Sequence, residues 1–323
     1  MIQALPSLEA VLDRDCEQRV EPGYLEAVQA RPGHRVLLFQ AGKAPVRGDA
    51  LAFLDPAEAA GRLPADTLTI YLGKTVDGHH PGLPDGTDLV LKVLTDDAGA
   101  PALLPDGAEF LGYRDAAGLL PAADAAIFIQ AQAVANWHNS HPRCPRCGAA
   151  TESQWAGWMR RCTVDGSEHF PRTDPAVIVA IVGADEKILL ASNFAWPANR
   201  YSTVAGFVEA GESAEQAAVR EIAEEVGVRL HAVDYVGSQA WPFPRSLMLG
   251  FLARTSDTVP VPDGVEVREA RWFGREELQS AVLSGDAGIP GRLSIARELI
   301  EHWYGGPIAE PGDTAATVAG ARS

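Results

Sequence analysis

Hydrophobic residues in the first part of the chain gather in short runs that glycine, proline and aspartate interrupt. Three of these runs, at 35–39, 67–73 and 88–94, predict β-strands. The run from Ala122 to Trp137 has apolar residues at helical spacing and contains neither proline nor glycine, so it predicts a helix. We therefore expect an α+β domain over residues 1–138, although no motif within it indicates a chemistry.

The hydrophobic pattern changes in the second half of the chain. Short apolar runs there predict strands at 176–182, 187–192, 201–205, 233–241, 246–255 and 267–273. The strongest helical pattern covers Ser213–Val226, and weaker ones cover about 275–283 and 293–304. This order predicts a mixed sheet flanked by helices over residues 173–304. The segment 305–323 has no apolar period, and we expect it to be disordered.

Length and charge limit the classes of function. A chain of 323 residues suggests two or three domains. Its 27 basic and 43 acidic residues give a net charge of 27 − 43 = −16, which argues against a general affinity for nucleic-acid backbones. With this charge, a protein that handles polyphosphates needs metal ions as intermediaries. The sequence contains neither a long apolar run nor a basic, apolar N-terminus, so we expect no membrane span and a cytoplasmic location.

The helix predicted from Ser213 carries an unusual density of acidic residues. Glu221, Glu224 and Glu225 have i, i+3 and i+4 spacing, which places three carboxylates on one side. Arg220 is the nearby cation. A solvent-exposed acidic helix is one interpretation. Carboxylates gathered this way are better explained by a hard divalent cation such as Mg²⁺ or Mn²⁺.

The glycines around this helix complete a longer pattern. From Gly206 to Val228 the sequence fits G-x5-E-x7-R-E-U-x-E-E-x-G-U, where U is a bulky aliphatic residue, with every fixed position filled. This string resembles the Nudix box. The resemblance implies a Nudix α/β/α sandwich, and an enzyme that hydrolyses a nucleoside diphosphate linked to another group.

The same resemblance implies roles for individual residues. Glu221, Glu225 and the backbone carbonyl of Ala205 would bind divalent metal, and Glu224 would assist or activate water. Arg220 would orient the carboxylates through charge-assisted hydrogen bonds. The segment "GVEVREARWF" resembles the family stretch that supplies a later metal-binding glutamate, which corresponds to Glu266.

A second motif, "SQAWPFPRS" at 238–246, interleaves aromatic rings with proline. Rings on a stiff segment suit stacking on flat heterocycles, although a hydrophobic loop that closes the sheet edge is the alternative. The stretch resembles S-Q-P-W-P-F-P-x-S of NADH pyrophosphatases, with Ala240 in place of a proline. The resemblance, which covers about residues 135–304, implies the following substrate-binding residues: Gln239, Ala240, Trp241, Pro242, Phe243, Pro244, Arg245, Ser246, Ala296, Phe170 and Phe207.

Three of the four cysteines cluster between the two domains, at 139–172. Cys144 and Cys147 form a C-x-x-C knuckle, and Cys162 follows. Clustered cysteines in an intracellular chain indicate a metal site. NADH pyrophosphatases carry a four-cysteine zinc ribbon here, whereas this chain has Asp165 at the fourth position. Asp165 is the favoured fourth ligand of a structural zinc ion; His169 is a rival, and a ribbon without metal is the third possibility.

Together these resemblances predict metal-dependent hydrolysis of NADH and, less readily, NAD⁺, giving NMNH or NMN and AMP. Removal of NAD caps from RNA is a related expectation, and five arginines around the ribbon could receive RNA or face acidic neighbours. The alternatives are a Nudix hydrolase of another substrate such as ADP-ribose, and a non-catalytic nucleotide-sensing module. The intact carboxylate set argues against the sensor. The resemblance also implies a homodimer.

Overall fold

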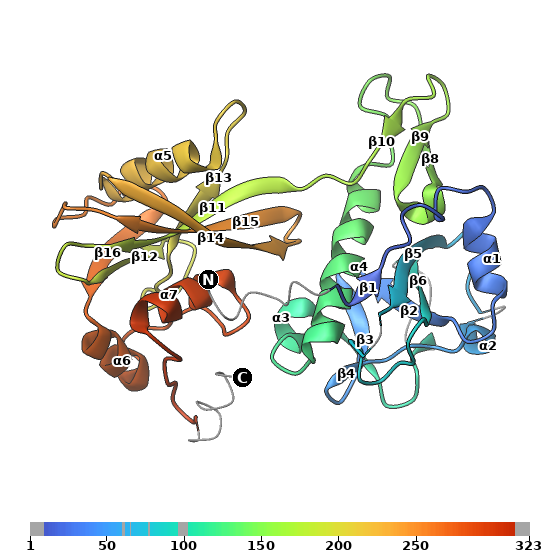
Figure 1. Ribbon diagram of the computed structural model, residues 1–323, viewed down its shortest axis with the longest axis horizontal. Helices are drawn as coiled ribbons and strands as arrows, with labels where there is room; N and C mark the ends of the chain where they lie inside the picture. Colours follow the sequence, from blue (N-terminus) through green and yellow to red (C-terminus); the bar gives the residue numbers. More distant parts are fainter. Residues whose placement is uncertain (1–9, 60–61, 65, 77, 96–102, 314–323) are drawn as a thin grey trace. The chain divides into compact units, whose positions relative to one another are not determined.

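The computed structural model describes residues 10–59, 62–64, 66–76, 78–95 and 103–313. The contacts divide the chain into two compact units (Figure 1). The N-terminal unit runs to Thr173 and also contains Pro242–Arg245; the C-terminal unit contains Asp174–Trp241 and the chain from Ser246. No helix among the described residues has the length and hydrophobicity that a membrane span requires.

The N-terminal unit is built on one sheet in the order β1-β5-β6-β2-β3-β4, with β7 beside β3. Its strands are β1 (Leu12–Asp13), β2 (Arg35–Gln40), β3 (Lys43–Arg47), β4 (Ala50–Leu51), β5 (Leu68–Thr75), β6 (Asp88–Leu94) and β7 (Glu109–Gly112). Its helices are α1 (Tyr24–Ala30), α2 (Pro56–Ala59), α3 (Tyr113–Ala116) and α4 (Ala122–Ser140). The three strands and the long helix predicted from the sequence are confirmed as β2, β5, β6 and α4.

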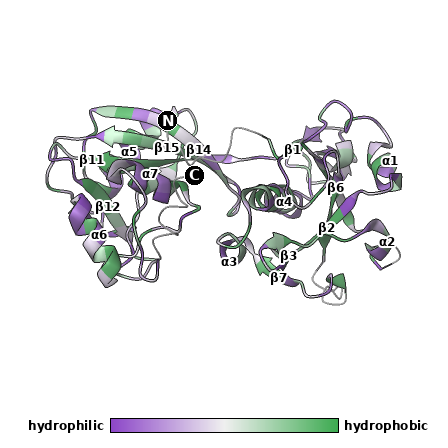
Figure 2. Cartoon of the chain, turned by 60° about the horizontal axis from the view of Figure 1, so that its bottom comes forward, coloured by the Kyte–Doolittle hydropathy of each residue, from purple (hydrophilic) through white to green (hydrophobic). Residues whose placement is uncertain are grey.

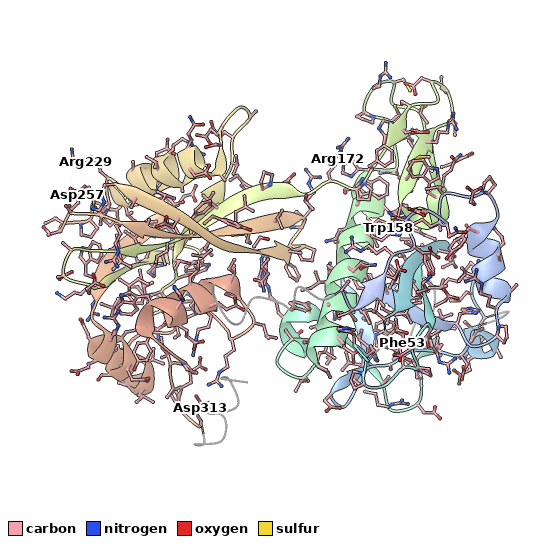
Figure 3. All side chains as sticks on the ribbon, in the orientation of Figure 1. Phe53, Trp158, Arg172, Arg229, Asp257 and Asp313 are labelled. Atoms are coloured by element: carbon pink, nitrogen blue, oxygen red, sulfur yellow. The ribbon has the colours of Figure 1, made fainter. Side chains whose placement is uncertain are left out.

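The ribbon forms a small three-stranded sheet of β8 (Thr151–Gln154), β9 (Met159–Cys162) and β10 (Glu168–His169), with a 3₁₀ turn, η2, at Trp155–Gly157. Two side chains fasten it to the rest of its unit. The Trp158 indole donates to the Tyr71 carbonyl at 2.7 Å (Figure 3). Buried His138 bridges the Gly157 carbonyl and the Arg160 guanidinium, at 2.8 Å each. Burial lowers the pKa of His138 to about 4, so the imidazole is neutral and can accept from Arg160.

The C-terminal unit contains a sheet in the order β14-β15-β11-β12-β16, with β13 beside β11. The strands are β11 (Asp174–Val182), β12 (Ile188–Asn193), β13 (Val204–Phe207), β14 (Ala232–Trp241), β15 (Ser246–Arg254) and β16 (Val267–Phe273). β11 and β15 are parallel and the other pairs are antiparallel, which confirms the predicted mixed sheet.

Alternate residues of β11 pack on opposite faces of this sheet. Val177, Val179 and Ile181 join the cluster that includes buried residues of α5 (Ala214–Val226). Ile178 and Ala180 join the cluster on the other face, with α6 (Arg275–Ser284) and α7 (Ile295–Tyr304). The hydrophobic colour of the central strands in Figure 2 reflects burial on both faces. The α/β/α sandwich is therefore confirmed.

The chain after α7 differs from the expected disorder. Residues 305–313 lie against the unit, with the Ile308 side chain fully buried. The Arg297 guanidinium is 0% exposed and donates to the Ile308 carbonyl at 2.7 Å and to the Pro290 carbonyl at 3.2 Å. It also pairs with Glu301 and Glu310. One buried side chain and several polar contacts hold this segment, so its sequence needs no apolar period to be ordered. The rest of the segment predicted to be disordered, residues 314–323, lies outside the described residues.

We expect Arg297→Ala to destabilise the C-terminal unit by about 3–5 kcal/mol, because it leaves two carboxylates and two carbonyls without their buried partner. Urea denaturation of the variant measures this loss. The matched control is Arg229→Ala, which removes an exposed ion pair with Asp257 (Figure 3) and should change stability by less than about 1 kcal/mol. Equal losses of stability in the two variants would show that the buried contacts of Arg297 do not hold residues 305–313 in place.

Candidate metal and diphosphate site

The acidic residues are positioned by a helix whose two ends are fixed locally. Ser213 and Gln216 form a reciprocal capping box, with hydrogen bonds of 3.2 and 2.9 Å. Gly227 ends the helix in the left-handed conformation at φ 66°. These limits, α5 at Ala214–Val226, confirm the predicted helix. They also fix which side of the helix carries the carboxylates.

Arg220 connects four groups of the site. Its Nε and Nη2 form a bidentate pair with Glu212, at 2.7 and 2.8 Å. Its Nη1 lies 2.9 Å from Glu221 and 3.0 Å from Glu224. Nη2 also donates to the Phe207 carbonyl at 2.9 Å, which joins the end of β13 to α5. The hydrogen bonds from Arg220 and from the Glu209 amide lower the pKa of Glu212 to about 2.

Glu221 lies directly over Gly206 of β13. A Cβ atom at position 206 would fall 1.9 Å from the Glu221 carboxyl carbon. Only glycine therefore lets this carboxylate lie against the strand, beside Ala205. The first glycine of the motif is thus explained by a close approach between strand and side chain, at a point where φ is not in the left-handed region.

Glu225 is the least neutralised member of the cluster. Burial, and then the charges of Glu221, Glu266, Asp263 and Glu224, raises its pKa to about 8. Within the described part of the chain, no side chain forms an ion pair with Glu225 or Glu266. The oxygens suit a hard divalent cation, which would relieve the repulsion. Among the described residues these oxygens are not gathered as closely as the ligand atoms of the ribbon.

Asp263 was not anticipated from the sequence, where the Asp-Gly pair indicates only a turn. Its carboxylate accepts from the amides of Glu266 and Val267, at 3.1 and 2.8 Å. These bonds hold the loop that precedes β16 and carries the exposed Glu266, whose charge contributes to the raised pKa of Glu225. The Phe194 amide donates to the Glu266 carbonyl at 3.0 Å, so a second loop adjoins this position.

The aromatic motif is divided between two environments. Gln239, Ala240 and Trp241 belong to β14, where Trp241 pairs with the buried Ser246 across the hairpin. Both ends of the Gln239 amide are engaged: Nε2 donates to the Leu293 carbonyl at 2.7 Å, and Oε1 accepts from the amide of Ile295 at 2.9 Å. Gln239 thereby fixes the start of α7, where Ala296 is buried.

Pro242–Arg245 packs within the N-terminal unit. The Asn136 amide donates to the carbonyls of Pro242 and Pro244, at 3.0 and 2.8 Å. The Phe243 ring lies 6.0 Å from that of Tyr113, and the Arg114 guanidinium lies 5.3 Å above it. The Phe243 ring therefore has packing partners in this unit, and its predicted contact with the substrate stays a prediction.

Two further aromatic residues named from the resemblance lie in different units. Phe207 ends β13 and is 55% exposed, with its carbonyl bound by Arg220. Phe170 follows β10 in the N-terminal unit, and its ring lies 5.4 Å from that of Trp155. Both rings remain accessible at the surface of their own unit.

The ribbon brings the four predicted ligands together. The ligand atoms of Cys144, Cys147, Cys162 and Asp165 all lie within 4.8 Å of one another, the one such group among the described residues. Three soft sulfur donors and one oxygen fit tetrahedral zinc. His169 is not in the group; its Nε2 lies 3.1 Å from the Ser167 hydroxyl.

Backbone amides and Ser167 prepare this site. The amides of Val164 and Asp165 donate to the Cys162 sulfur, at 3.4 Å each. The Ser167 amide and hydroxyl donate to Oδ1 of Asp165, and these bonds hold the pKa of the Asp165 carboxyl well below its usual range. The other oxygen, Oδ2, lies 3.8 Å from the Cys144 sulfur. The aspartate is thus ionised and oriented toward the thiols.

Family models match three consecutive parts of the chain. Residues 172–290 match the NUDIX domain, 139–170 the NADH pyrophosphatase zinc ribbon domain, and 21–137 the NADH pyrophosphatase-like rudimentary NUDIX domain. The last match identifies the N-terminal unit, for which the sequence pattern had indicated only an α+β class.

Individual proteins agree with these models. NAD-capped RNA hydrolase NudC of Mycobacterium tuberculosis is 34% identical, over 94% of this chain and 96% of that protein. The human NAD-capped RNA hydrolase NUDT12 is 37% identical, over 56% of this chain and 42% of that protein. A solved NUDIX hydrolase from Nitrosomonas europaea is 25% identical, covering 53% of this chain and 96% of its own, with a TM-score of 0.38. The family models and the match to the mycobacterial NudC show that the chain belongs to the NudC family of Nudix hydrolases, with the NADH pyrophosphatase zinc ribbon.

Proposed function

We propose that this protein is a metal-dependent hydrolase that cleaves the diphosphate of NADH and, less readily, NAD⁺, giving NMNH or NMN and AMP. The same reaction on NAD-capped RNA would release NMN and leave a 5′-phosphate on the RNA. The observation that carries the proposal is the carboxylate cluster around Arg220, in which Glu225 faces four other acidic groups. Membership of the NudC family supports the choice of substrate.

The cluster suggests a division of roles. Glu221, Glu225, Glu266 and the Ala205 carbonyl would hold the divalent cations, Mg²⁺ or Mn²⁺. Such ions, when bound, neutralise the diphosphate and acidify water. Glu224 is 61% exposed, and its carboxylate can accept a proton from the water that attacks phosphorus. Arg220 keeps Glu221 and Glu224 in place by charge-assisted hydrogen bonds.

Trp241 is the proposed stacking residue for a flat ring of the dinucleotide, with Phe207 and Phe170 as further contacts. Gln239 and Ser246, both buried, would act by shaping the hairpin. The remaining members of the motif, from Pro242 to Arg245, would set the course of the chain beside Trp241. We further propose a homodimer, on the family resemblance. Competition kinetics with NADH, NAD⁺, ADP-ribose and NAD-capped RNA, with Mg²⁺ or Mn²⁺ and with a chelator, tests the proposed activity and its substrate order.

Glu225→Gln should lower turnover of NADH by about a hundredfold or more, because a ligand charge is lost while the shape is kept. It should also change the pH dependence of metal-free stability. The folded pKa of about 8 exceeds the ordinary 4.5, so protonation stabilises the fold below pH 4.5 and this contribution is lost as pH rises through 8.

In chelator, Glu225→Gln should therefore unfold at higher temperature than the parent at pH 8.5, with the difference shrinking towards pH 5. Glu215→Gln, in the exposed first turn of α5, is the matched control and should change neither turnover nor this pH profile. Near-normal turnover of Glu225→Gln at saturating Mg²⁺ would contradict the proposed role.

Trp241→Ala should raise KM for NADH about tenfold, since a lost stacking face corresponds to about 1–3 kcal/mol of base binding. A simple dinucleoside polyphosphate should be affected by a different factor. Phe243→Ala removes the packing on Tyr113 and should mainly lower the thermal stability of the N-terminal unit. Equal losses on every substrate with Trp241→Ala would assign Trp241 to packing instead.

The purified protein should contain about one zinc ion per chain, which elemental analysis measures. Asp165→Ala should weaken zinc binding and Asp165→Cys should tighten it, whereas His169→Ala should leave it unchanged. Removal of zinc should lower thermal stability rather than directly stop the chemistry. Zinc-free protein with full stability would refute the structural site, and loss of zinc in His169→Ala alone would move the fourth ligand.

A further inference from the structure

The loop that follows β12 presents two aromatic side chains that no part of the proposed mechanism uses. Phe194 is 50% exposed and Trp196 is 37% exposed. Neither belongs to the two hydrophobic clusters that fill the C-terminal unit. Two large rings exposed on one loop offer a surface on which a ligand or partner could pack.

The loop holds these rings in a fixed backbone conformation. The Arg268 guanidinium donates to the carbonyls of Phe194 and Trp196, at 3.1 and 3.2 Å. The Asn193 side chain accepts from the Ala195 amide at 2.8 Å, and the Trp196 amide donates to the Asn193 carbonyl at 3.1 Å. The hydrogen-bonded backbone of the loop therefore keeps the two rings exposed. Binding of a ligand to them would require little further ordering of this backbone.

Each ring is accompanied by an arginine in an otherwise acidic chain. The Arg268 guanidinium lies 5.2 Å from the Phe194 ring centre, and that of Arg200 lies 5.9 Å from the Trp196 ring centre. The Nη1 atom of Arg268 is buried without a hydrogen-bond partner among the described residues. Aromatic faces with interleaved cations match the alternation of bases and phosphates in single-stranded nucleic acid.

The loop also adjoins the candidate metal cluster. The Phe194 amide is bound to the carbonyl of Glu266, whose side-chain charge acts on Glu225. A polynucleotide attached to a diphosphate in the cluster would pass close to this loop, whereas a free dinucleotide ends at its second nucleoside. The aromatic hairpin that contains Trp241 is already assigned to the dinucleotide.

We propose that Phe194 and Trp196 form a stacking surface for the first nucleotides of an RNA chain that follows an NAD cap. The exposed Arg200 would face an adjoining phosphate, and Arg268 would hold the loop through its hydrogen bonds to the two carbonyls. The inference rests on the proposed function, because it extends the same site from the dinucleotide to the RNA body. It makes the two rings determinants of the preference for capped RNA over free NADH.

The test compares the double variant Phe194→Ala/Trp196→Ala with the parent on two substrates, NADH and a single-stranded RNA with a 5′ NAD cap. Loss of the stacking faces should lower kcat/KM for capped RNA about tenfold or more, and kcat/KM for NADH should stay within about twofold of the parent value. The conservative pair Phe194→Tyr/Trp196→Phe should retain the parent's preference. The control Val259→Ala/Leu283→Ala removes two other exposed apolar side chains of the same unit. It should leave kcat/KM unchanged for both NADH and capped RNA.

Equal losses on NADH and capped RNA would overturn the proposal, because the rings would then serve the dinucleotide site. Unchanged rates on both would also overturn it, as would a change from dimer to monomer in light scattering. Binding of fluorescent 5′-monophosphate RNA, followed by anisotropy with Mg²⁺ present, tests the surface independently of turnover. If the parent hydrolyses neither substrate, the proposed function fails, and weaker RNA binding by the double variant would still identify the stacking surface.

Discussion

The candidate site depends on the pairing of a single guanidinium with several carboxylates. Arg220 places its donors on Glu212, Glu221 and Glu224, and in doing so ties α5 to the end of β13. No donor remains for Glu225, which is partly buried and faces further acidic groups. The protein can thus fix the directions of its carboxylates without cancelling their charge. A site arranged in this way retains its affinity for divalent cations and, through them, for a diphosphate.

The α/β/α sandwich holds the strand and the helix that carry these carboxylates in fixed positions. The sheet is buried on both faces, so β11 and its neighbours form a rigid base from which β13 leads into α5. Gly206 then allows the Glu221 carboxylate to approach the strand more closely than any side chain at that position would permit. The loops after β12 and before β16 meet the same cluster through the contact between Phe194 and Glu266. The strand and the helix therefore fix the positions of the carboxylates, and the two loops supply the residues around them.

Features with a local cause could be predicted from the sequence. The capping box, the left-handed Gly227 and the apolar runs fixed the limits of α5 and of the central strands. Features that arise from distant contacts could not. The short strand β3 contains Pro45 and is held by its neighbours, and Phe243 packs on α3 from more than a hundred residues away. The buried contacts of Arg297 and the hydrogen bonds of Asp263 likewise have no signal in the local sequence pattern, because they form only when the chain has folded.

The ribbon and the acidic cluster differ in the softness of their donors, and this difference separates their metals. Three thiols select a soft or borderline ion such as zinc, whereas carboxylates and a carbonyl suit Mg²⁺ or Mn²⁺. Asp165 brings a hard oxygen into the sulfur site, which should weaken zinc binding relative to a fourth thiolate. Ser167 offsets part of this loss, because its two hydrogen bonds keep the carboxylate ionised and directed inward. The aspartate is therefore prepared by its neighbours for the ligand role proposed for it, and the four donors of the ribbon would form a closed structural site that leaves hydrolysis to the acidic cluster.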